Sequence, residues 1–277
     1  MSELVRTIRL RLAYEGTRYS GWQVQPGRAT VQGAVAEAIR RVTGEVVVPK
    51  GSSRTDAGVH AFDQVAAFTT TSPLEPKAWR RALNAHLPAD ICVTAADLAP
   101  PGFDPVAAAV RKRYRYRIHD AEAKPVFTWP VVWPWRGRLD VSAMAAAAAA
   151  LVGEHDFTSF ESTPSTRLSK VRTIHSLEVF RPPPAAPGPE AEAWIEVEGN
   201  GFLYNMVRII AGSLAMVGAG RRSPEWLAQA LAARSRPAAG PTAPPQGLVL
   251  VSIQLAPDPS PEPAPPPCPS SPNDSAP

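Results

Sequence analysis

The chain is poor in the residues that metal centres, disulfide frameworks and membrane spans require. Its 277 residues include two cysteines, Cys92 in an apolar run and Cys268 near the end. This pair suits a reducing compartment and builds neither a disulfide framework nor a thiolate metal site. No apolar run approaches the roughly 20 residues of a membrane span. The opening MSELVRTIRLRL lacks the apolar block of a signal peptide, so we expect a soluble, cytoplasmic protein.

Acidic residues are outnumbered over most of the chain. Residues 257–277 hold ten prolines, three acids and no Lys or Arg, a composition that predicts a disordered tail. The other 256 residues carry 29 Lys and Arg against 22 Asp and Glu, which is 25 minus the three in the tail. This positive excess favours a polyanionic partner, although an arginine-rich coding composition accounts for it equally well.

Hydrophobic periodicity predicts the same series of elements twice, because alternating positions indicate strands and three- or four-residue spacings indicate helices. In the first half we expect strands over 8–14, 45–49, 62–70 and 91–98, and helices over 31–42, with Thr30 as N-cap, and 77–87. In the second half we expect strands over 113–119, 171–180, 193–198 and 247–255, and helices over 141–152, 200–217, capped by Asn200, and 224–234.

The order β-α-β-β-α-β in the first half, repeated in the second with one added helix, predicts an α+β fold of two tandem ferredoxin-like units with largely antiparallel sheets. We assign the units to residues 1–105 and 106–256. Each unit is expected to cover one sheet face with helices. The other faces would then form a joint surface, with a site in the cleft between the units.

The stretch GSSRTDAGVHA is the first candidate for chemistry. It lies between two predicted strands and is too polar to be one, so we expect a connecting loop, where functional residues are common. Arg54 and Asp56 point the same way in extended backbone, and Thr55 points the other way. Two interpretations stay open: an Asx-type turn with a solvated Arg54, or a reactive carboxylate. His60 and Asp63 nearby are too few for a metal site.

Arginine and aromatic residues alternate in RKRYRYRI, which begins at Arg111. The parity of a strand places its four arginines on one face, and Lys112, Tyr114 and Tyr116 on the other. A row of guanidinium groups beside aromatic rings suits single-stranded RNA, which offers phosphates and stackable bases. A solvated edge strand with its tyrosines packed in the core explains the pattern as well.

Arg208 is a charge inside the apolar helix of GFLYNMVRIIAGSLAMVGAG. A buried, unpaired guanidinium costs several kcal/mol, so it must reach solvent or meet a carboxylate. Asp56 is a candidate partner, and pairing would keep that carboxylate ionised and oriented. The alternative is an arginine that snorkels to solvent from the edge of the helix.

Eight motifs in order resemble the tRNA pseudouridine synthase A family, from about Arg9 to Leu255. The most specific is the RTDAGVHA core, which is similar to the signature loop of the family. The others also follow the family order: YEGTRYSGWQVQ with TVQGAVAEAI, LNAHLP, RKRYRYRI, GEHDFTSF, VRTI, GFLYNMVRIIAG and APPQGLVL.

The resemblance implies an isomerase that converts uridine to pseudouridine at positions 38, 39 and 40 in the anticodon stem and loop of tRNA. It implies a homodimer that needs no cofactor or metal, with the pseudouridine synthase fold of two RNA-recognition-like halves around a basic cleft. Asp56 is then the catalytic residue, attacking the ribose or the base or assisting glycal formation. Among substrate-binding residues, Tyr114 stacks on the uridine, Arg54 is the arginine of the signature loop, and Arg208 pairs with the aspartate.

Three positions depart from the family pattern. Ser53 occupies a position where the family usually has glycine or another small residue, and Glu15 occupies the position of an aspartate. Val106 lies near the usual position of an arginine, which removes one expected RNA contact. Two other functions stay open. A catalytically silent RNA-binding protein on the same scaffold would not need Asp56, and a synthase with other RNA targets would keep the whole set.

Overall fold

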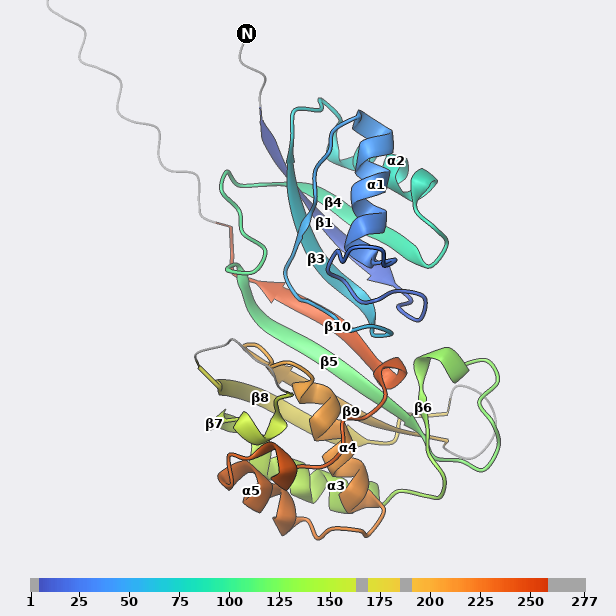
Figure 1. Cartoon of the computed structure of the whole chain (residues 1–277), viewed down its shortest axis with the longest axis vertical. Helices are drawn as coiled ribbons and strands as arrows, with labels where there is room; N and C mark the ends of the chain where they lie inside the picture. Colours follow the sequence, from blue (N-terminus) through green and yellow to red (C-terminus); the bar gives the residue numbers. More distant parts are fainter. Residues whose placement is uncertain (1–4, 163–168, 185–190, 259–277) are drawn as a thin grey trace, which may run out of the picture.

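The computed structural model describes residues 5–162, 169–184 and 191–258 and shows two groups of helices on one long sheet (Figure 1). Most of the predicted tail, residues 259–277, lies outside the described residues, as does Cys268. Asp258 is described and forms an ion pair with Arg9, with 2.9 Å between Oδ1 and Nη1. Across the part of the chain that is described, no helix is long and apolar enough to cross a membrane.

The N-terminal half contains most of the elements that the periodicity predicts. They are β1 (Arg6–Tyr14), α1 (Val31–Thr43), β2 (Lys50–Gly51), β3 (His60–Thr70), α2 (Pro76–His86) and β4 (Ile91–Ala99). Thr30 caps α1 as predicted, because its side chain accepts a hydrogen bond from the Gly33 amide. Alternate residues of β1, such as Leu10 and Leu12, are fully buried, in the face that α1 and α2 cover (Figure 1).

The C-terminal half has a longer series of elements over its described residues. Its strands and helices are β5 (Ala109–His119), β6 (Trp133–Pro134), α3 (Val141–Ala148), β7 (Gly153–Asp156), β8 (Val171–Phe180), β9 (Glu192–Gly199), α4 (Met206–Gly218), α5 (Glu225–Ala232) and β10 (Leu248–Leu255). Short 3₁₀ helices occupy 129–131, 149–151, 158–160, 236–238 and 245–247. The predicted hairpin is confirmed, since β8 and β9 pair antiparallel.

The strands of the described residues form one sheet in the order β4-β1-β3-β10-β5-β9-β8-β7, with β2 beside β3 and β6 beside β5. The neighbours pair antiparallel except β10 with β3 and β5 with β6. The predicted α+β class with a largely antiparallel sheet is confirmed. Strand β10 joins the halves, because Leu250 pairs with Ala61 on one side and with Tyr114 on the other.

The predicted strand over residues 45–49 is wrong, because only Lys50 and Gly51 pair with β3. Two of its three valines face solvent, with Val46 86% and Val48 57% exposed, while Val47 packs against the core. The Glu45 carboxylate instead accepts hydrogen bonds from the Thr71 amide at 2.9 Å and its hydroxyl at 2.8 Å. Side-chain contacts of this kind hold the segment near β3 without a backbone ladder.

The predicted helix start at Asn200 is also wrong, because α4 begins at Met206. Asn200 pairs with β8 instead: its amide donates to the Thr173 carbonyl, and its Oδ1 accepts from the Thr173 amide, both at 3.1 Å. The N-cap position is held by Asn205, which has a φ of 60° and no side-chain capping bond. The polar side chain of Asn200 therefore bonds to a neighbouring strand instead of capping the helix. The six residues before α4 form an irregular segment.

Candidate active site

The GSSRTDAGVHA segment is a loop between β2 and β3 that packs tightly on the loop after β1. The Trp22 amide donates a hydrogen bond of 3.0 Å to the Thr55 carbonyl. A Cβ on Gly16 would lie 2.0 Å from the Val59 carbonyl oxygen, so only glycine allows the two backbones to approach this closely. The packing of the two loops fixes the position of the residues between Thr55 and Val59.

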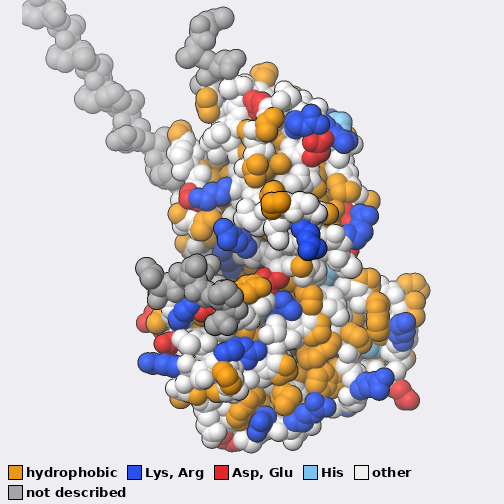
Figure 2. Space-filling view, viewed as in Figure 1, with side chains coloured by type: hydrophobic (Ala, Val, Ile, Leu, Met, Phe, Trp, Pro, Cys, Tyr) orange, Lys and Arg blue, Asp and Glu red, His pale blue; other side chains and the backbone are white. Residues whose placement is uncertain are grey.

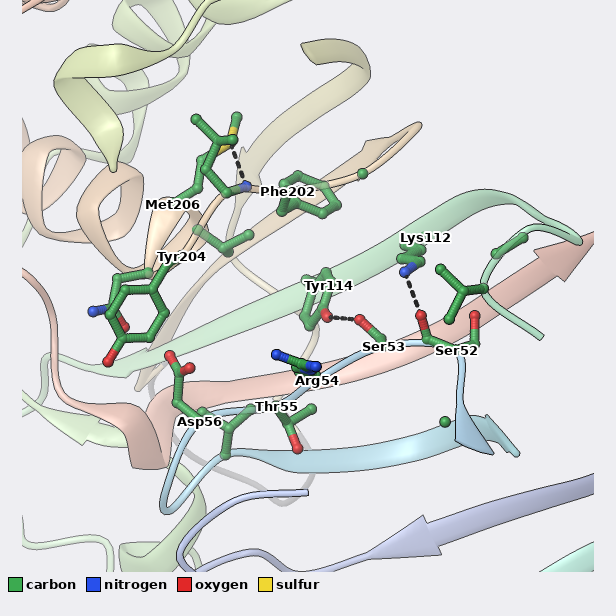
Figure 3. A pocket seen from close by; sticks show the side chains of 18 of the residues that line it. Ser52, Ser53, Arg54, Thr55, Asp56, Lys112, Tyr114, Phe202, Tyr204 and Met206 are labelled. Atoms are coloured by element: carbon green, nitrogen blue, oxygen red, sulfur yellow. Dashed lines mark hydrogen bonds between the residues drawn. The ribbon is translucent and has the colours of Figure 1, made fainter. Parts of the chain in front are cut away.

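Arg54 and Asp56 both line one cavity, and Thr55 between them points away from it (Figure 3). The Thr55 side chain is buried, with Oγ1 2.8 Å from the hydroxyl of Tyr14. Arg54 is exposed and makes no hydrogen bond or ion pair with any residue that the structure describes. The predicted alternation is therefore confirmed, and the guanidinium of Arg54 is left available for a ligand.

Arg208 of α4 contacts Asp56 from the C-terminal half of the molecule. Its Nη1 lies 3.2 Å from Asp56 Oδ2 and also donates to Asn205 Oδ1 at 2.8 Å. Its Nε donates to the Ala243 carbonyl at 2.8 Å. The predicted pairing is confirmed. The alternative, an arginine snorkelling to solvent, is wrong because the side chain is only 16% exposed.

The Asp56 carboxylate is held by this partner rather than by a turn of its own. Its backbone carbonyl accepts from the Val59 amide at 3.1 Å, so the turn is closed by main-chain atoms. Burial raises the pKa of Asp56 above its ordinary value, and the charge and hydrogen bond of Arg208 act in the opposite direction. The net shift is upward, which makes the ionised carboxylate more basic than a solvated one.

Tyr114 of β5 forms a wall of the cavity beside Arg54 (Figure 3). It is 6% exposed, its hydroxyl lies 2.9 Å from Ser53 Oγ, and its ring meets Phe202 edge-on with 5.3 Å between the centroids. Burial raises the pKa of Tyr114 to about 12, so the phenol stays protonated at neutral pH. Ser53, one of the three departures noted in the sequence, thus fixes the orientation of this ring.

The cavity around these residues has a volume of about 970 Å³ and lies at the junction of the two halves. Its lining includes Lys50, Arg54, Lys112, Arg172 and Arg208, with Asp56 as the one acid among the residues lining it. Lys and Arg side chains also lie on both sides of this junction at the surface (Figure 2). Such a surplus of positive charge attracts an anionic ligand such as a phosphate backbone.

The arginine row of RKRYRYRI faces away from this cavity and pairs with glutamates of β9, so the suggested phosphate ladder is not part of this site. Arg111 Nη1 lies 2.9 Å from Glu198 Oε1, and Arg117 Nη2 lies 2.8 Å from Glu192 Oε1. The Arg115 guanidinium stacks over Trp194, at 3.9 Å from the ring centroid. Glutamates of β9 therefore offset most of the charge of the row. Of the alternative interpretation, the edge position is wrong, because β5 lies between β10 and β9, but the packing of Tyr114 and Tyr116 in the core is confirmed.

The cavity opens on the sheet face that also carries the helices, contrary to the prediction of a joint helix-free surface. Lys112 and Tyr114 line it, and they share their strand face with Tyr116 and Ile118, which are fully buried in the core. The helix groups cover the two halves of this face separately (Figure 1). The site therefore lies between the two groups of helices, where the joining strand β10 brings β3 next to β5.

His60 and Asp63 have separate structural partners. The Gly16 amide donates to His60 Nδ1 at 2.9 Å, so Nε2 carries the proton and donates to the Gln246 carbonyl at 3.2 Å. Asp63 pairs with Arg11. Burial lowers the pKa of His60, which keeps it neutral. Within the described ranges, no three His, Cys, Asp or Glu side chains form a group that could hold a metal ion.

Tyr204 and Lys112 are among the cavity residues that were not predicted as site residues. Tyr204, just before α4, lines the cavity and is 52% exposed. Lys112 also lines it and donates from Nζ to the Ser52 carbonyl at 2.8 Å. The sequence contained an indication of each: Tyr204 precedes Arg208 by four residues, one helical turn, and Lys112 shares the strand face of Tyr114. Val106, near the usual place of an arginine, lines the cavity and is 48% exposed.

Comparison with known proteins relates the sequence of this chain to tRNA-modifying enzymes. A family described as tRNA pseudouridine synthase matches residues 12–104 and 147–254. The protein named tRNA pseudouridine synthase A of Geotalea uraniireducens is 44% identical over 250 residues, covering 90% of this chain and 99% of the relative. Those of the same name from Geobacter sulfurreducens and Brevibacillus brevis are 43% and 45% identical, covering 91% and 90% of this chain and 100% and 99% of the relatives.

Proposed function

The chain belongs to the tRNA pseudouridine synthase family, whose members are isomerases, and from this membership we propose that it modifies uridines 38, 39 and 40 in the anticodon stem and loop of tRNA. The observation that carries the proposal is the Asp56 carboxylate, paired with Arg208 at 3.2 Å in a cavity whose other charged lining residues are all basic. A site built this way offers one reactive carboxylate to a substrate that carries phosphates.

The proposed reaction breaks the bond between C1′ of the ribose and N1 of uracil and forms a bond between C1′ and C5. Asp56 acts as the nucleophile, at the ribose or at the base, or assists glycal formation. The detached uracil rotates and rejoins through C5, the proton of C5 leaves to solvent, and N1 gains a proton. Substrate and product are isomers, so the atoms balance without a co-reactant. Arg208 holds the carboxylate in place through this sequence.

The target uridine must leave its stack to reach Asp56, at a cost of a few kcal/mol, which stacking on an aromatic ring offsets in part. Tyr114 is the proposed ring for the uracil. Its contacts with Ser53 and Phe202 hold it in one orientation, so little conformational entropy is lost when the base arrives.

Release of tritium from tRNA labelled at C5 of uridine tests the function directly, because C5 loses its hydrogen only when the new bond forms. We expect release from a tRNA with uridines at positions 38 to 40, and none when these three are replaced by cytidine. Release from other positions would indicate a synthase with different targets. Binding to several suitable tRNAs without any release would indicate a catalytically silent RNA-binding protein.

Arg54→Ala is expected to slow the reaction by about 10²-fold, because the side chain lies in the cavity without a partner among the described residues. Its proposed role is to position the flipped nucleotide or to fill its vacated place. Single-turnover tritium release measures the rate. Arg28→Ala, which changes an exposed arginine that does not line the cavity, is the matched control. Equal rates for Arg54→Ala and wild type would contradict the role of Arg54.

We also propose a cytoplasmic homodimer in which residues 1–105 and 106–256 form two ferredoxin-like units. The segment between β5 and β6 exposes apolar side chains, among them Val126 at 71% and Phe127 at 100%, and exposed apolar patches mark protein contacts. Light scattering at the assay concentration is expected to give twice the mass of the chain for wild type, and a smaller mass for Phe127→Glu. A monomeric wild type would contradict the dimer.

A further inference from the structure

Tyr204 is an aromatic ring in the cavity to which the proposed reaction assigns no role. It is 52% exposed, and its hydroxyl forms no hydrogen bond with any residue that the structure describes. Figure 3 places the ring at the Asp56 end of the cavity, whereas Tyr114 lies toward Ser53. The cavity thus has two tyrosines in different states: one buried and hydrogen-bonded, the other open to a ligand.

The backbone beneath Tyr204 is fixed although the side chain is exposed. Its carbonyl accepts from the Ser162 amide at 3.1 Å. The next residue, Asn205, has a φ of 60°, a left-handed conformation that asparagine tolerates better than most residues. The Asn205 side chain donates to Ser162 Oγ at 3.0 Å and accepts from Arg208 at 2.8 Å.

This network ties Tyr204 to the reactive carboxylate. Arg208 bonds to Asn205 and Asp56 through the same nitrogen, Nη1. The backbone of Tyr204 therefore has a set position relative to Asp56. An exposed tyrosine on a fixed backbone is suited to stacking, because only its two side-chain torsions remain to be ordered on binding.

The size of the cavity leaves room for this contact. Its volume of about 970 Å³ lies at the upper end of the range of about 300–1,000 Å³ that holds drug-sized ligands, and a single uracil is much smaller than these. A uracil that stacks on Tyr114 and reaches Asp56 therefore leaves space at the mouth for a neighbouring nucleotide.

We propose that Tyr204 stacks on the base of a nucleotide adjacent to the target uridine and so positions the RNA over Asp56. The inference rests on the proposed function and extends it from the target to its neighbour. The ligand is an unpaired base in RNA, held by its π face rather than by its hydrogen-bonding edge, so the contact tolerates any sequence at that position.

Two substitutions separate the ring from its hydroxyl. Tyr204→Ala is expected to lower kcat/KM by roughly 5- to 150-fold, the loss that corresponds to one stacked base, whereas Tyr204→Phe keeps the stack and stays within about twofold of wild type. Phe62→Ala is the matched control, since Phe62 is 55% exposed and does not line the cavity. Equal losses in Tyr204→Ala and Tyr204→Phe would overturn stacking and assign the role to the hydroxyl.

The second arm tests the partner of Tyr204 with RNAs in which the 5′ or the 3′ neighbour of the target is abasic. If Tyr204 stacks on one of these bases, Tyr204→Ala should lower kcat/KM only slightly on the RNA that lacks that base. An undiminished loss on both abasic RNAs would overturn the proposal. Fluorescence anisotropy measures the affinity of the same variants for the same RNAs. An inactive wild type would refute the proposed function, and the affinities would still decide whether Tyr204 stacks.

Discussion

Asp56→Asn is expected to abolish tritium release, with a loss of about 10⁴-fold or more, as for removal of a catalytic nucleophile. Asparagine is nearly isosteric with aspartate, so Arg208 keeps an oxygen within reach, but an amide cannot serve as the nucleophile. RNA binding should stay close to that of wild type, because five basic side chains line the cavity and the substitution removes its acid. Single-turnover assays at matched RNA saturation measure the loss.

The same substitution should not lower stability at neutral pH, which distinguishes it from misfolding. Burial raises the folded-state pKa of Asp56 above its unfolded value, so the folded protein binds this proton more tightly than the unfolded chain does. The stability that protonation contributes is complete below the unfolded pKa and is lost as pH rises through the folded pKa. At neutral pH the ionised form therefore costs stability, and Asp56→Asn removes that cost, while the amide oxygen, Asn205 Oδ1 and the Ala243 carbonyl still accept hydrogen bonds from Arg208 and limit the loss from its missing counter-charge.

Thermal melts at several pH values test whether Asp56→Asn raises or lowers stability. The Tm of Asp56→Asn should equal or exceed that of wild type at pH 7, and the difference should shrink as pH falls and wild-type Asp56 becomes protonated. Ser53→Ala serves as a comparison, since it should lower Tm by leaving the buried Tyr114 hydroxyl without its partner. A large drop in the Tm of Asp56→Asn at pH 7 would mean that the carboxylate is structural, and lost activity would then not identify a nucleophile.

The sequence predicted those parts of the fold that rest on local periodicity. Strand β1 and helix α1 follow from alternating apolar residues and from a Thr30 cap whose bond to Gly33 is local. The errors came from residues whose partners are distant in the chain. Asn200 pairs with Thr173 and Glu45 with Thr71, so neither behaves as its immediate neighbours indicated. Local patterns do not contain the position of a partner that lies 26 or more residues away.

The site was also predictable only in part, because the sequence does not show which distant residues lie beside one another. Asp56 was a candidate partner for Arg208, 152 residues away, because a charge in an apolar helix needs a carboxylate or solvent, and the family resemblance chose between the two. For the arginine row, strand parity gave the face of each residue but not the strand beside it, here β9 with its glutamates. Tyr204 was missed because its exposure depends on the irregular segment that the predicted helix start at Asn200 had concealed.

Arg208→Gln is expected to reduce turnover at neutral pH by about 10²-fold, because the carboxylate loses the group that fixes its position. The loss should depend on pH. Asp56 reacts in its ionised form, and Arg208 lowers the pKa that burial raises. Without Arg208 the pKa rises further, so the acidic limb of the rate profile moves to higher pH and the gap to wild type narrows as pH increases. Single-turnover tritium release across a pH series measures this.

Arg208→Lys separates the charge from the geometry. An ammonium group keeps the positive charge near Asp56, but it cannot also reproduce the planar set of bonds to Asn205 and Ala243. The acidic limb should therefore stay closer to that of wild type than in Arg208→Gln, while the plateau rate remains low. An acidic limb that does not move in Arg208→Gln would show that the rate does not follow the ionisation of Asp56, and the guanidinium would then act on RNA binding, through KM rather than kcat.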